Sequence, residues 1–269
     1  MNTNLTPLFA LRGTLTPRQK LIAEIAGAFA LVGAWYGIVA LDLVPARILP
    51  WPHRVILAFP ELHYDDALVR NAMYSIKINL FGNLQAIVLA VPLGMILGLF
   101  VIPRSMVERA ISAVRYLPLP PVIGIFIALF GIATNLKVQF LAFAIFVYLL
   151  PVVIQRVDEV LEVYAQTAKT LGATRWQTIK TVFVPDVASR VFGDIIVLNA
   201  LSWTYITFAE LINANDGGVG ALAYIAARQS RPDKAYAVLF TIIFIGFCLD
   251  KLLKIADKQL FPHKYVKGG

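Results

Sequence analysis

Long apolar segments separated by short polar ones dominate the pattern of hydrophobic and polar positions along the chain. Six of these segments approach or exceed the roughly 20 residues that an α-helix needs to cross the hydrocarbon core of a membrane. They are residues 21–41, 78–102, 116–136, 138–155, 187–212 and 235–250. Three prolines at the start of segment 116–136 predict that this helix is broken there or preceded by a turn. The pattern therefore predicts an all-α integral membrane protein with six transmembrane helices.

The longest polar segment between these spans, residues 157–186, has a helical pattern of its own. Its apolar and small positions recur at steps of four and three on one face, at Leu161, Ala165, Ala168 and Gly172. Gly172 stands where a helix is expected to end, as a C-cap glycine. Thr174 and Gln177 have the spacing of a capping box, which predicts a second short helix. Pro185 is expected to end that second helix and to begin the next span.

The distribution of Lys and Arg predicts the orientation of the spans. With the N-terminus in the cytoplasm, the inner segments carry 15 of these residues and the outer segments carry 7. The inner segments are 1–20, 103–116, 156–186 and 251–269, and the outer segments are 42–70, 133–137 and 213–234. Because Lys and Arg concentrate on the cytoplasmic side, both termini and residues 157–186 are predicted to be cytoplasmic. The expected organisation is a cytoplasmic tail 1–20, a six-span domain 21–255 and a cytoplasmic tail 256–269.

Composition supports the membrane class. The chain has 269 residues, of which 59% are hydrophobic and 15% are charged, and its mean hydropathy is +0.73. Soluble domains contain about 25% charged residues. Twenty residues precede the first apolar segment and no small-residue cleavage site follows it, so we expect this segment to be retained as a span. The single cysteine, Cys248, lies in an apolar segment, which excludes an internal disulfide and a cysteine metal site.

The sequence contains no signature of a catalytic site. The three histidines lie in predicted loops without metal-ligand spacing, at His53, His63 and His263. No G-x-x-x-x-G-K-[ST] motif is present, so the chain has no phosphate-binding loop of that type. Acidic residues of the spans lie near span ends, at Glu24, Asp194, Glu210 and Asp250. Carriers driven by protons or sodium need titratable groups inside the membrane, so the pattern argues against one.

Residues 157–186 resemble the cytoplasmic coupling loop of ABC-importer permeases. The signature of that loop is Glu-Ala-Ala, three residues, Gly, nine residues and Ile-x-Leu-Pro. The positions that match its spacing are Ala168, Gly172, Val182, Val184 and Pro185, with Val in place of Ile and Leu. Gln166 and Thr167 replace the leading Glu and the first Ala. In the family this loop docks into a cleft of the ATP-binding subunit, which implies that Gln166, Ala168, Gly172, Ala173 and Pro185 couple the chain to an ATPase.

Other segments are similar to the nitrate/sulfonate/taurine branch of these permeases. The similar segments, over about residues 49–260, are Leu49–Val55, Ser75 with Gly82, Ala90–Gly98, Leu117-Pro118 with Phe130–Ile132, and Glu210 with Gly217–Gly220. Ile78 stands where the branch usually has Arg. An ordinary helical hairpin is the plain alternative for residues 157–186. A DNA-binding helix-turn-helix is disfavoured because membrane spans closely bracket the hairpin.

The resemblance implies a permease subunit with the fold of type I ABC importers, in the bacterial cytoplasmic (inner) membrane. Its implied partners are a second permease chain, two ATP-binding subunits, an extracytoplasmic solute-binding protein and membrane lipid, but no nucleic acid. The chain itself is expected to bind no cofactor, because ATP and Mg belong to the ATPase subunits. The implied solute is a small anion such as nitrate, bicarbonate, sulfonate or taurine. A secondary carrier or channel, and a transport-dead membrane scaffold, are the alternatives.

Span 187–212 carries an unusually polar stripe, consisting of Asn199, Ser202, Trp203, Thr204 and Thr207. Our hypothesis is that Asn199, Ser202, Trp203 and Thr207 include residues that line the translocation path; hydrogen bonding between helices is the alternative. In segment 78–102, Gly82, Gly94 and Gly98 permit close approach of another helix. Packing within the chain and a seam between two chains both explain these glycines.

Overall fold

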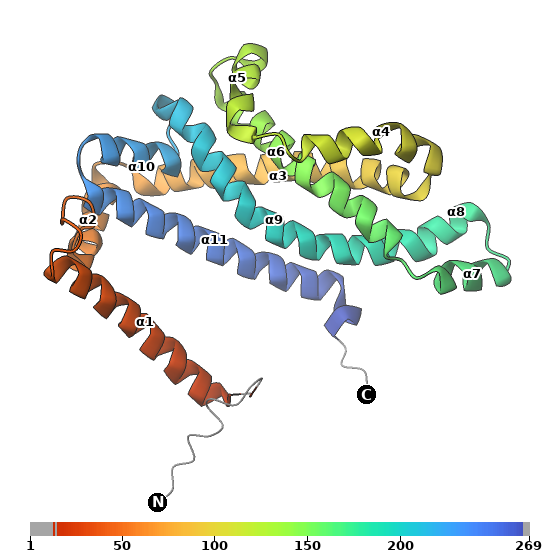
Figure 1. The fold of residues 1–269 in the computed structure, drawn as a ribbon, viewed down its shortest axis with the longest axis horizontal. Coiled ribbons are helices and arrows are strands. Elements are labelled where there is room, and N and C mark those ends of the chain that lie inside the picture. The colour runs from red at the N-terminus through yellow and green to blue at the C-terminus, as the bar shows by residue number, and fades with distance from the viewer. Residues whose placement is uncertain (1–12, 14, 266–269) are drawn as a thin grey trace, which may run out of the picture.

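The computed structural model describes residue 13 and residues 15–265, and Figure 1 shows their arrangement. The described part of the chain is helical and contains no strand, which confirms the all-α class. The helices are α1 (Pro17–Ala40), α2 (Pro52–Tyr64), α3 (Leu68–Leu99), α4 (Val101–Val114), α5 (Leu119–Phe130), α6 (Thr134–Asp158), α7 (Glu162–Thr170), α8 (Arg175–Thr178), α9 (Val184–Ile212), α10 (Val219–Arg228) and α11 (Pro232–Leu260). Short 3₁₀ helices at Ala214–Asp216 and Pro262–Tyr265 follow α9 and α11.

Four helical segments of the described chain are long and apolar enough to cross a membrane: α1, α3, α6 and the run Arg175–Ile212. A fifth crossing results if α4 and α5, which are bent by 108° relative to each other, count as one broken span. The bend lies at the predicted proline-rich break, with Pro118 as the N-cap of α5. The predicted span 235–250 lies in α11, which is not among these candidates.

Both long outer loops expected from the sequence contain a helix. Residues 42–70 include α2, whose residues Val55, Ala58 and Leu62 are buried, and residues 213–234 include α10. Helix α3 also begins at Leu68, well before the predicted start of that span. The loop predictions are therefore wrong in detail, because helices of 13 and 10 residues are too short for a search for long apolar segments to find.

The prediction that Pro185 ends the second hairpin helix is also wrong. Helix α8, a π-helical turn at Ile179–Phe183 and helix α9 form one continuous run. Proline cannot donate the usual backbone hydrogen bond, and its ring crowds the preceding turn. The wider π-helical turn just before Pro185, in which the Val184 N–H donates to the Ile179 carbonyl, accommodates the ring without ending the helix.

The core forms where α3 packs along α6. A Cβ atom added at Gly82 would lie 2.8 Å from Leu141, and one at Gly94 would lie 2.6 Å from Val153. At Gly98 an added Cβ would lie 2.6 Å from Val157. Real side chains do not come this close, so all three positions need glycine. Packing within the chain therefore explains these glycines, rather than a seam between two chains.

Helix α1 stands apart from the other long helices (Figure 1). Val39 is its only buried residue. Near its C-terminal end, the Trp35 ring stacks on Phe240 of α11 at 5.9 Å, and its Nε1 donates to the carbonyl of Pro50. The rest of the apolar surface of α1 is left exposed by the described chain, as expected for a helix that faces lipid.

Ion pairs hold α2 to the start of α11 at the end of the molecule that carries α10. Arg231 donates two hydrogen bonds to Glu61, at 3.0 and 2.7 Å. Lys234 lies 2.8 Å from Glu61 and 2.6 Å from Asp66. The hydrogen bonds from Arg231 and Lys234 lower the pKa of Glu61 to about 2. This cluster therefore stays fully charged at neutral pH and fixes one end of the helical bundle.

Candidate functional site

The turn between α7 and α8 has the backbone geometry that the sequence predicts. Gly172 has a φ of +83°, in the left-handed region. Its N–H donates to the carbonyl of Lys169 at 2.9 Å, and the N–H of Ala173 donates to the carbonyl of Ala168 at 3.0 Å. These two bonds form a Schellman motif, which satisfies carbonyl groups at the end of α7. The C-cap prediction is confirmed.

The capping box at the start of α8 is also confirmed. The Thr174 N–H donates to the side chain of Gln177 at 2.8 Å, and the Gln177 N–H donates to the Thr174 hydroxyl at 3.3 Å. Reciprocal bonds of this kind fix where the chain enters a helix. Consecutive caps thus make a rigid elbow, which projects at the end of the molecule opposite α2 and α10 (Figure 1).

Two large apolar side chains at this elbow escaped the sequence analysis. Leu171 is 83% exposed and Trp176 is 72% exposed, on either side of Gly172. Together they form an exposed apolar surface on this projection. The sequence did contain a signal for this surface, because Leu171 and Trp176 stand among polar residues there.

The structure separates the predicted coupling residues by exposure. Gln166 and Pro185 are exposed, whereas Ala168 and Ala173 are partly covered. Gln166 donates a hydrogen bond to Glu162 within α7 at 3.0 Å. Of the face predicted for α7, Ala165 alone is buried, so this helix presents most of its surface outward.

A network of charges, which we call the ionic collar, joins the end of α6 to the beginning of α9. Arg156 donates two hydrogen bonds of 2.8 Å to Asp194 and one of 2.6 Å to Glu159. Arg190 lies 3.0 Å from Asp186 and 3.9 Å from Glu159. The hydrogen bond from Arg156 lowers the pKa of Glu159. Because both helices that carry the elbow are tied at its base, the elbow and the two helices form one mechanical unit.

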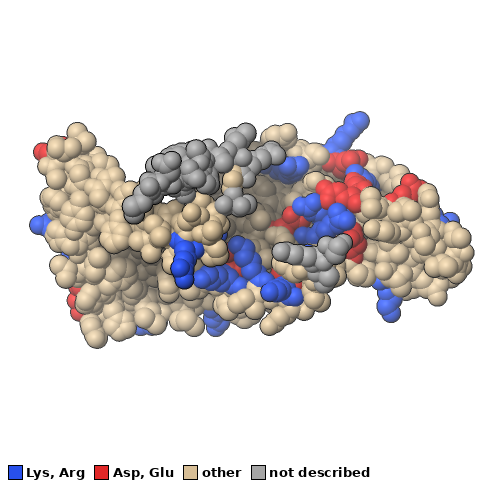
Figure 2. Space-filling view, turned by 90° about the horizontal axis from the view of Figure 1, so that it is seen from below, with Lys and Arg blue, Asp and Glu red and all other residues tan. Residues whose placement is uncertain are grey.

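Figure 2 shows acidic and basic residues side by side toward the α7–α8 end of the molecule. Uncharged residues cover most of the opposite end of this face. On this face, charges of both signs gather toward the elbow end.

The polar stripe of α9 divides into two kinds of residue. The Asn79 side chain in α3 donates to the Ser202 hydroxyl at 2.8 Å, and that hydroxyl donates to the Asn199 carbonyl at 2.6 Å. Thr207 donates to the carbonyl of Trp203 at 2.7 Å. Ser202 thus joins two helices, and Thr207 bonds within its own helix. For both hydroxyls, the alternative of structural hydrogen bonding has direct support.

Asn199 and Trp203, in contrast, line open space. Both border a cavity of about 220 Å³ between α9 and α11, and Asn199 also borders a second cavity of about 160 Å³ with Asn79 and Asn83. The indole Nε1 of Trp203 is buried without a hydrogen-bond partner among the described residues. Sequence analysis missed Asn79 and Asn83, although two asparagines four residues apart in a charge-free span were a visible signal.

A buried network at the other end of α9 unites residues from two separate motifs. Ser75 in α3 donates to Glu210 at 2.5 Å, and the Gly220 N–H donates to the same carboxylate at 2.7 Å. The Val219 N–H donates to the Ser75 hydroxyl at 2.9 Å, and the Gly218 N–H donates to Asn71 at 2.8 Å. Ser75 and Glu210 have no exposed surface. The network thereby fixes the N-terminus of α10 against α3 and α9.

Residues 90–262 match the family of binding-protein-dependent transport system inner membrane components. The chain belongs to this family. The permease is 25% identical over 254 residues to the taurine transport system permease protein TauC of Escherichia coli, covering 91% of each chain. It is 24% identical over 242 residues to the putative aliphatic sulfonates transport permease protein SsuC of Bacillus subtilis, covering 89% of this chain and 86% of that protein.

A solved structure shares the fold of the permease. A crystal structure of an amino acid ABC transporter with histidines superposes with a TM-score of 0.55 and 17% identity, over 74% of this chain and 97% of the other. The resemblance to binding-protein-dependent permeases of the taurine, sulfonate and nitrate branch is thus confirmed. The permease is a multi-pass inner-membrane component of an ABC transporter and is not itself catalytic.

Proposed function

We propose that this permease pairs with a second permease chain to form the translocation path of an ABC importer for a small anion. The elbow between α7 and α8 carries the proposal, because it is rigid, projecting and capped by exposed apolar side chains. Two ATP-binding subunits grip the elbows of the two permease chains at Gln166, Ala168, Gly172, Ala173 and Pro185, beside Leu171 and Trp176. The ionic collar transmits movement of the elbow to α6 and α9, and a solute-binding protein delivers the solute on the opposite side.

The topology we infer has six spans with both termini in the cytoplasm. Helices α4 and α5 supply one broken crossing, and α11 supplies the sixth. The 29 residues of α11 reach about 43 Å at about 1.5 Å per residue, and residues 235–249 carry no charge. The tails 1–20 and 256–269 are then cytoplasmic, with the six-span domain 21–255 and its coupling loop 157–186 between them. The excess of Lys and Arg in the inner segments supports this orientation.

The solute class rests on the similarity to permeases named for taurine and aliphatic sulfonates. Uncharged hydrogen-bonding groups bind an oxoanion weakly enough to release it, whereas a fixed cation in the path would retain it. Asn199 and Trp203 have this character and border open space, so we place them on the path, with Thr207 one turn away and Ser202 holding the helix in place.

Alanine at Asn199 is expected to lower solute uptake several-fold while leaving the amount of folded protein unchanged. The side chain borders two cavities and has no hydrogen-bond partner among the described residues whose loss would unfold the protein. Uptake into proteoliposomes that contain the complete transporter checks this prediction. Thr204→Ala, at an exposed position of the same helix, is the matched control. Equal uptake by both variants would exclude Asn199 from the path.

The proposed function is tested by purifying the tagged permease in mild detergent from cells that express it with its neighbouring genes. We expect an ATP-hydrolysing protein to copurify, and its activity to increase when a solute-binding protein and solute are added. A folded permease without an ATPase partner would favour a secondary carrier or channel. An ATPase partner without any solute-dependent activity would favour a transport-dead scaffold.

A further inference from the structure

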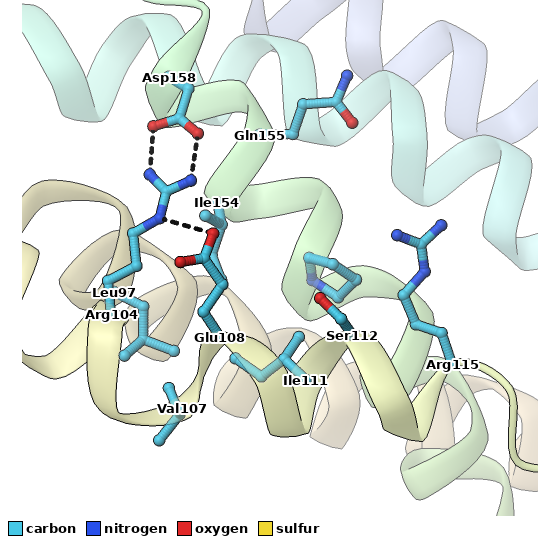
Figure 3. A pocket seen from close by; sticks show the side chains of 11 residues that line it. Leu97, Arg104, Val107, Glu108, Ile111, Ser112, Arg115, Ile154, Gln155 and Asp158 are labelled. Carbon is cyan, nitrogen blue, oxygen red and sulfur yellow. Dashed lines mark hydrogen bonds and ion pairs between the residues drawn. The ribbon is translucent and has the colours of Figure 1, made fainter.

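A cavity of about 200 Å³ lies between α4 and the end of α6, at the start of the coupling loop, whose Asp158 lines it. Figure 3 shows it from close by. Apolar side chains form its walls and charged side chains stand at its two ends. The residues that line it are Leu97, Arg104, Val107, Glu108, Ile111, Ser112, Arg115, Pro151, Ile154, Gln155 and Asp158. Its volume is below the roughly 300–1,000 Å³ of sites for drug-sized ligands, so it suits a molecule of few non-hydrogen atoms.

One end of the cavity, the donor end, consists of Ser112 and Arg115. Neither side chain has a hydrogen bond or ion pair with any residue that the structure describes. Figure 3 shows them together at the end of the cavity away from Asp158. The exposed Arg115 guanidinium and the Ser112 hydroxyl both line this end of the cavity and offer donors to an oxoanion, because the planar donors of a guanidinium match two oxygen atoms at once.

The other end, the acidic end, has the opposite character. Arg104 donates to both oxygens of Asp158, at 2.7 and 2.9 Å, and its Nε lies 3.6 Å from Glu108. Two carboxylates therefore share one guanidinium, which leaves one negative charge in excess. The Glu108 side chain is 58% exposed and makes only the longer of these contacts, so it is available to an incoming cation.

The distance between the two ends of the cavity limits the length of the ligand. Glu108 and Ser112 lie four residues apart on α4, and Arg115, three residues further, is its C-cap residue with a helical backbone, so the three follow one face. At about 1.5 Å per residue, Ser112 is about 6 Å and Arg115 about 10 Å along the axis from Glu108. A ligand that reaches both ends carries its two charges a few bonds apart, with its carbon chain against Ile111 and Ile154.

We propose that this cavity binds a small zwitterion, in which a short carbon chain separates an ammonium group from an oxoanion. The oxoanion accepts hydrogen bonds from Ser112 and Arg115, and the ammonium group donates to Glu108. Two sources have this chemistry: a free amino-alkyl sulfonate or carboxylate, and the phosphoethanolamine headgroup of a membrane lipid. The cavity shares no lining residue with the proposed path. Only its position on the cytoplasmic side rests on the proposed function.

The test is calorimetric titration of the full-length permease in nanodiscs made of phosphatidylglycerol alone. The probes are taurine and O-phosphoethanolamine, with isethionate, which lacks the ammonium group, and ethylamine, which lacks the oxoanion. We expect both zwitterions to bind and each half-ligand to bind at least about tenfold more weakly, which corresponds to the loss of one charged contact. Isethionate binding as tightly as taurine, or no binding of either zwitterion, would overturn the proposal.

Variants assign the binding to this cavity. Arg115→Gln and Glu108→Gln are each expected to weaken taurine binding about tenfold or more. Arg109→Gln, at an exposed position of α4 that does not line the cavity, is expected to leave it unchanged. Loss of binding in Asn199→Ala but not in Arg115→Gln would move the binding to the path and refute the site.

Repeating the titration in nanodiscs that contain phosphatidylethanolamine separates the two sources. Taurine binding that weakens as this lipid is added identifies the headgroup as the resident ligand, and unchanged binding identifies a free solute. Either result upholds a zwitterion site. Because these titrations need no ATPase, a permease that binds taurine here yet recruits no ATPase would refute the proposed function and leave this site intact.

Discussion

Valine in place of Gly172 is expected to abolish ATP-driven uptake while the permease remains folded in the membrane. Gly172 has a φ of +83°, and an added Cβ would meet nothing within 4 Å. The free-energy cost of the substitution therefore comes from the backbone conformation of residue 172 and not from a steric clash. A residue other than glycine pays about 1–2 kcal/mol in the left-handed region, and a branched side chain more. The Schellman motif would open, and the contact surface formed by Leu171 and Trp176 would lose its shape.

Matched substitutions separate this backbone effect from the effect of added bulk. Gly172→Asn is expected to retain most uptake, because Asn tolerates the left-handed conformation. Gly193→Val adds the same bulk in open space on α9, where the backbone is helical, and should also retain uptake. Uptake and ATPase stimulation in proteoliposomes are the measurements. If Gly172→Val transports as well as Gly193→Val, the elbow does not need its left-handed residue and the coupling role is refuted.

Both caps of the elbow could be predicted because their information is local. A C-cap needs one residue that adopts positive φ, and a capping box needs two side chains three residues apart. Gly172, Thr174 and Gln177 meet these requirements in the sequence itself. Pro185 was misjudged for a related reason: proline interrupts the α-helical ladder, but the sequence does not show that a π-helical turn can absorb the interruption.

Helices α2 and α10, and the role of the glycines in α3, depend on contacts distant in sequence. Helix α2 is stabilised by burial of Val55 and Leu62 and by ion pairs to α11, which begins about 170 residues later. Gly94 and Gly98 have the spacing of a general packing motif. Only the position of α6 shows which helix they face. No local pattern could therefore choose between packing within the chain and a seam between two chains.

The residues of the candidate site divide in the same way, between those that local patterns predict and those that only distant contacts reveal. The resemblance supplied the positions of the elbow residues, but Asn79 was found only through its bond to Ser202, and the ionic collar only through the approach of α6 to α9. Ser75 and Glu210 were noted as members of unrelated motifs. A direct hydrogen bond across 135 residues joins the two motifs.

Removal of the Glu210 carboxylate is expected to destabilise the permease more than any other single change at its α10 end. In Glu210→Ala, the Ser75 hydroxyl and the Gly220 N–H lose a buried acceptor, and each unsatisfied donor costs about 1–3 kcal/mol. The melting temperature in detergent should fall by on the order of 10 °C, measured by intrinsic fluorescence.

The control for Glu210→Ala is Glu24→Ala. It removes an exposed carboxylate of α1 whose nearest cation, Lys20, lies 3.9 Å away. This variant should melt within about 2 °C of the wild type. Glu210→Gln keeps one acceptor oxygen and should melt between Glu210→Ala and the wild type. Equal melting temperatures for Glu210→Ala and Glu24→Ala would show that the Glu210 carboxylate does not stabilise the α10 end. The predicted order of melting temperatures follows because the Glu210 carboxylate accepts hydrogen bonds from both α3 and α10. Its loss therefore removes a contact of both helices with α9.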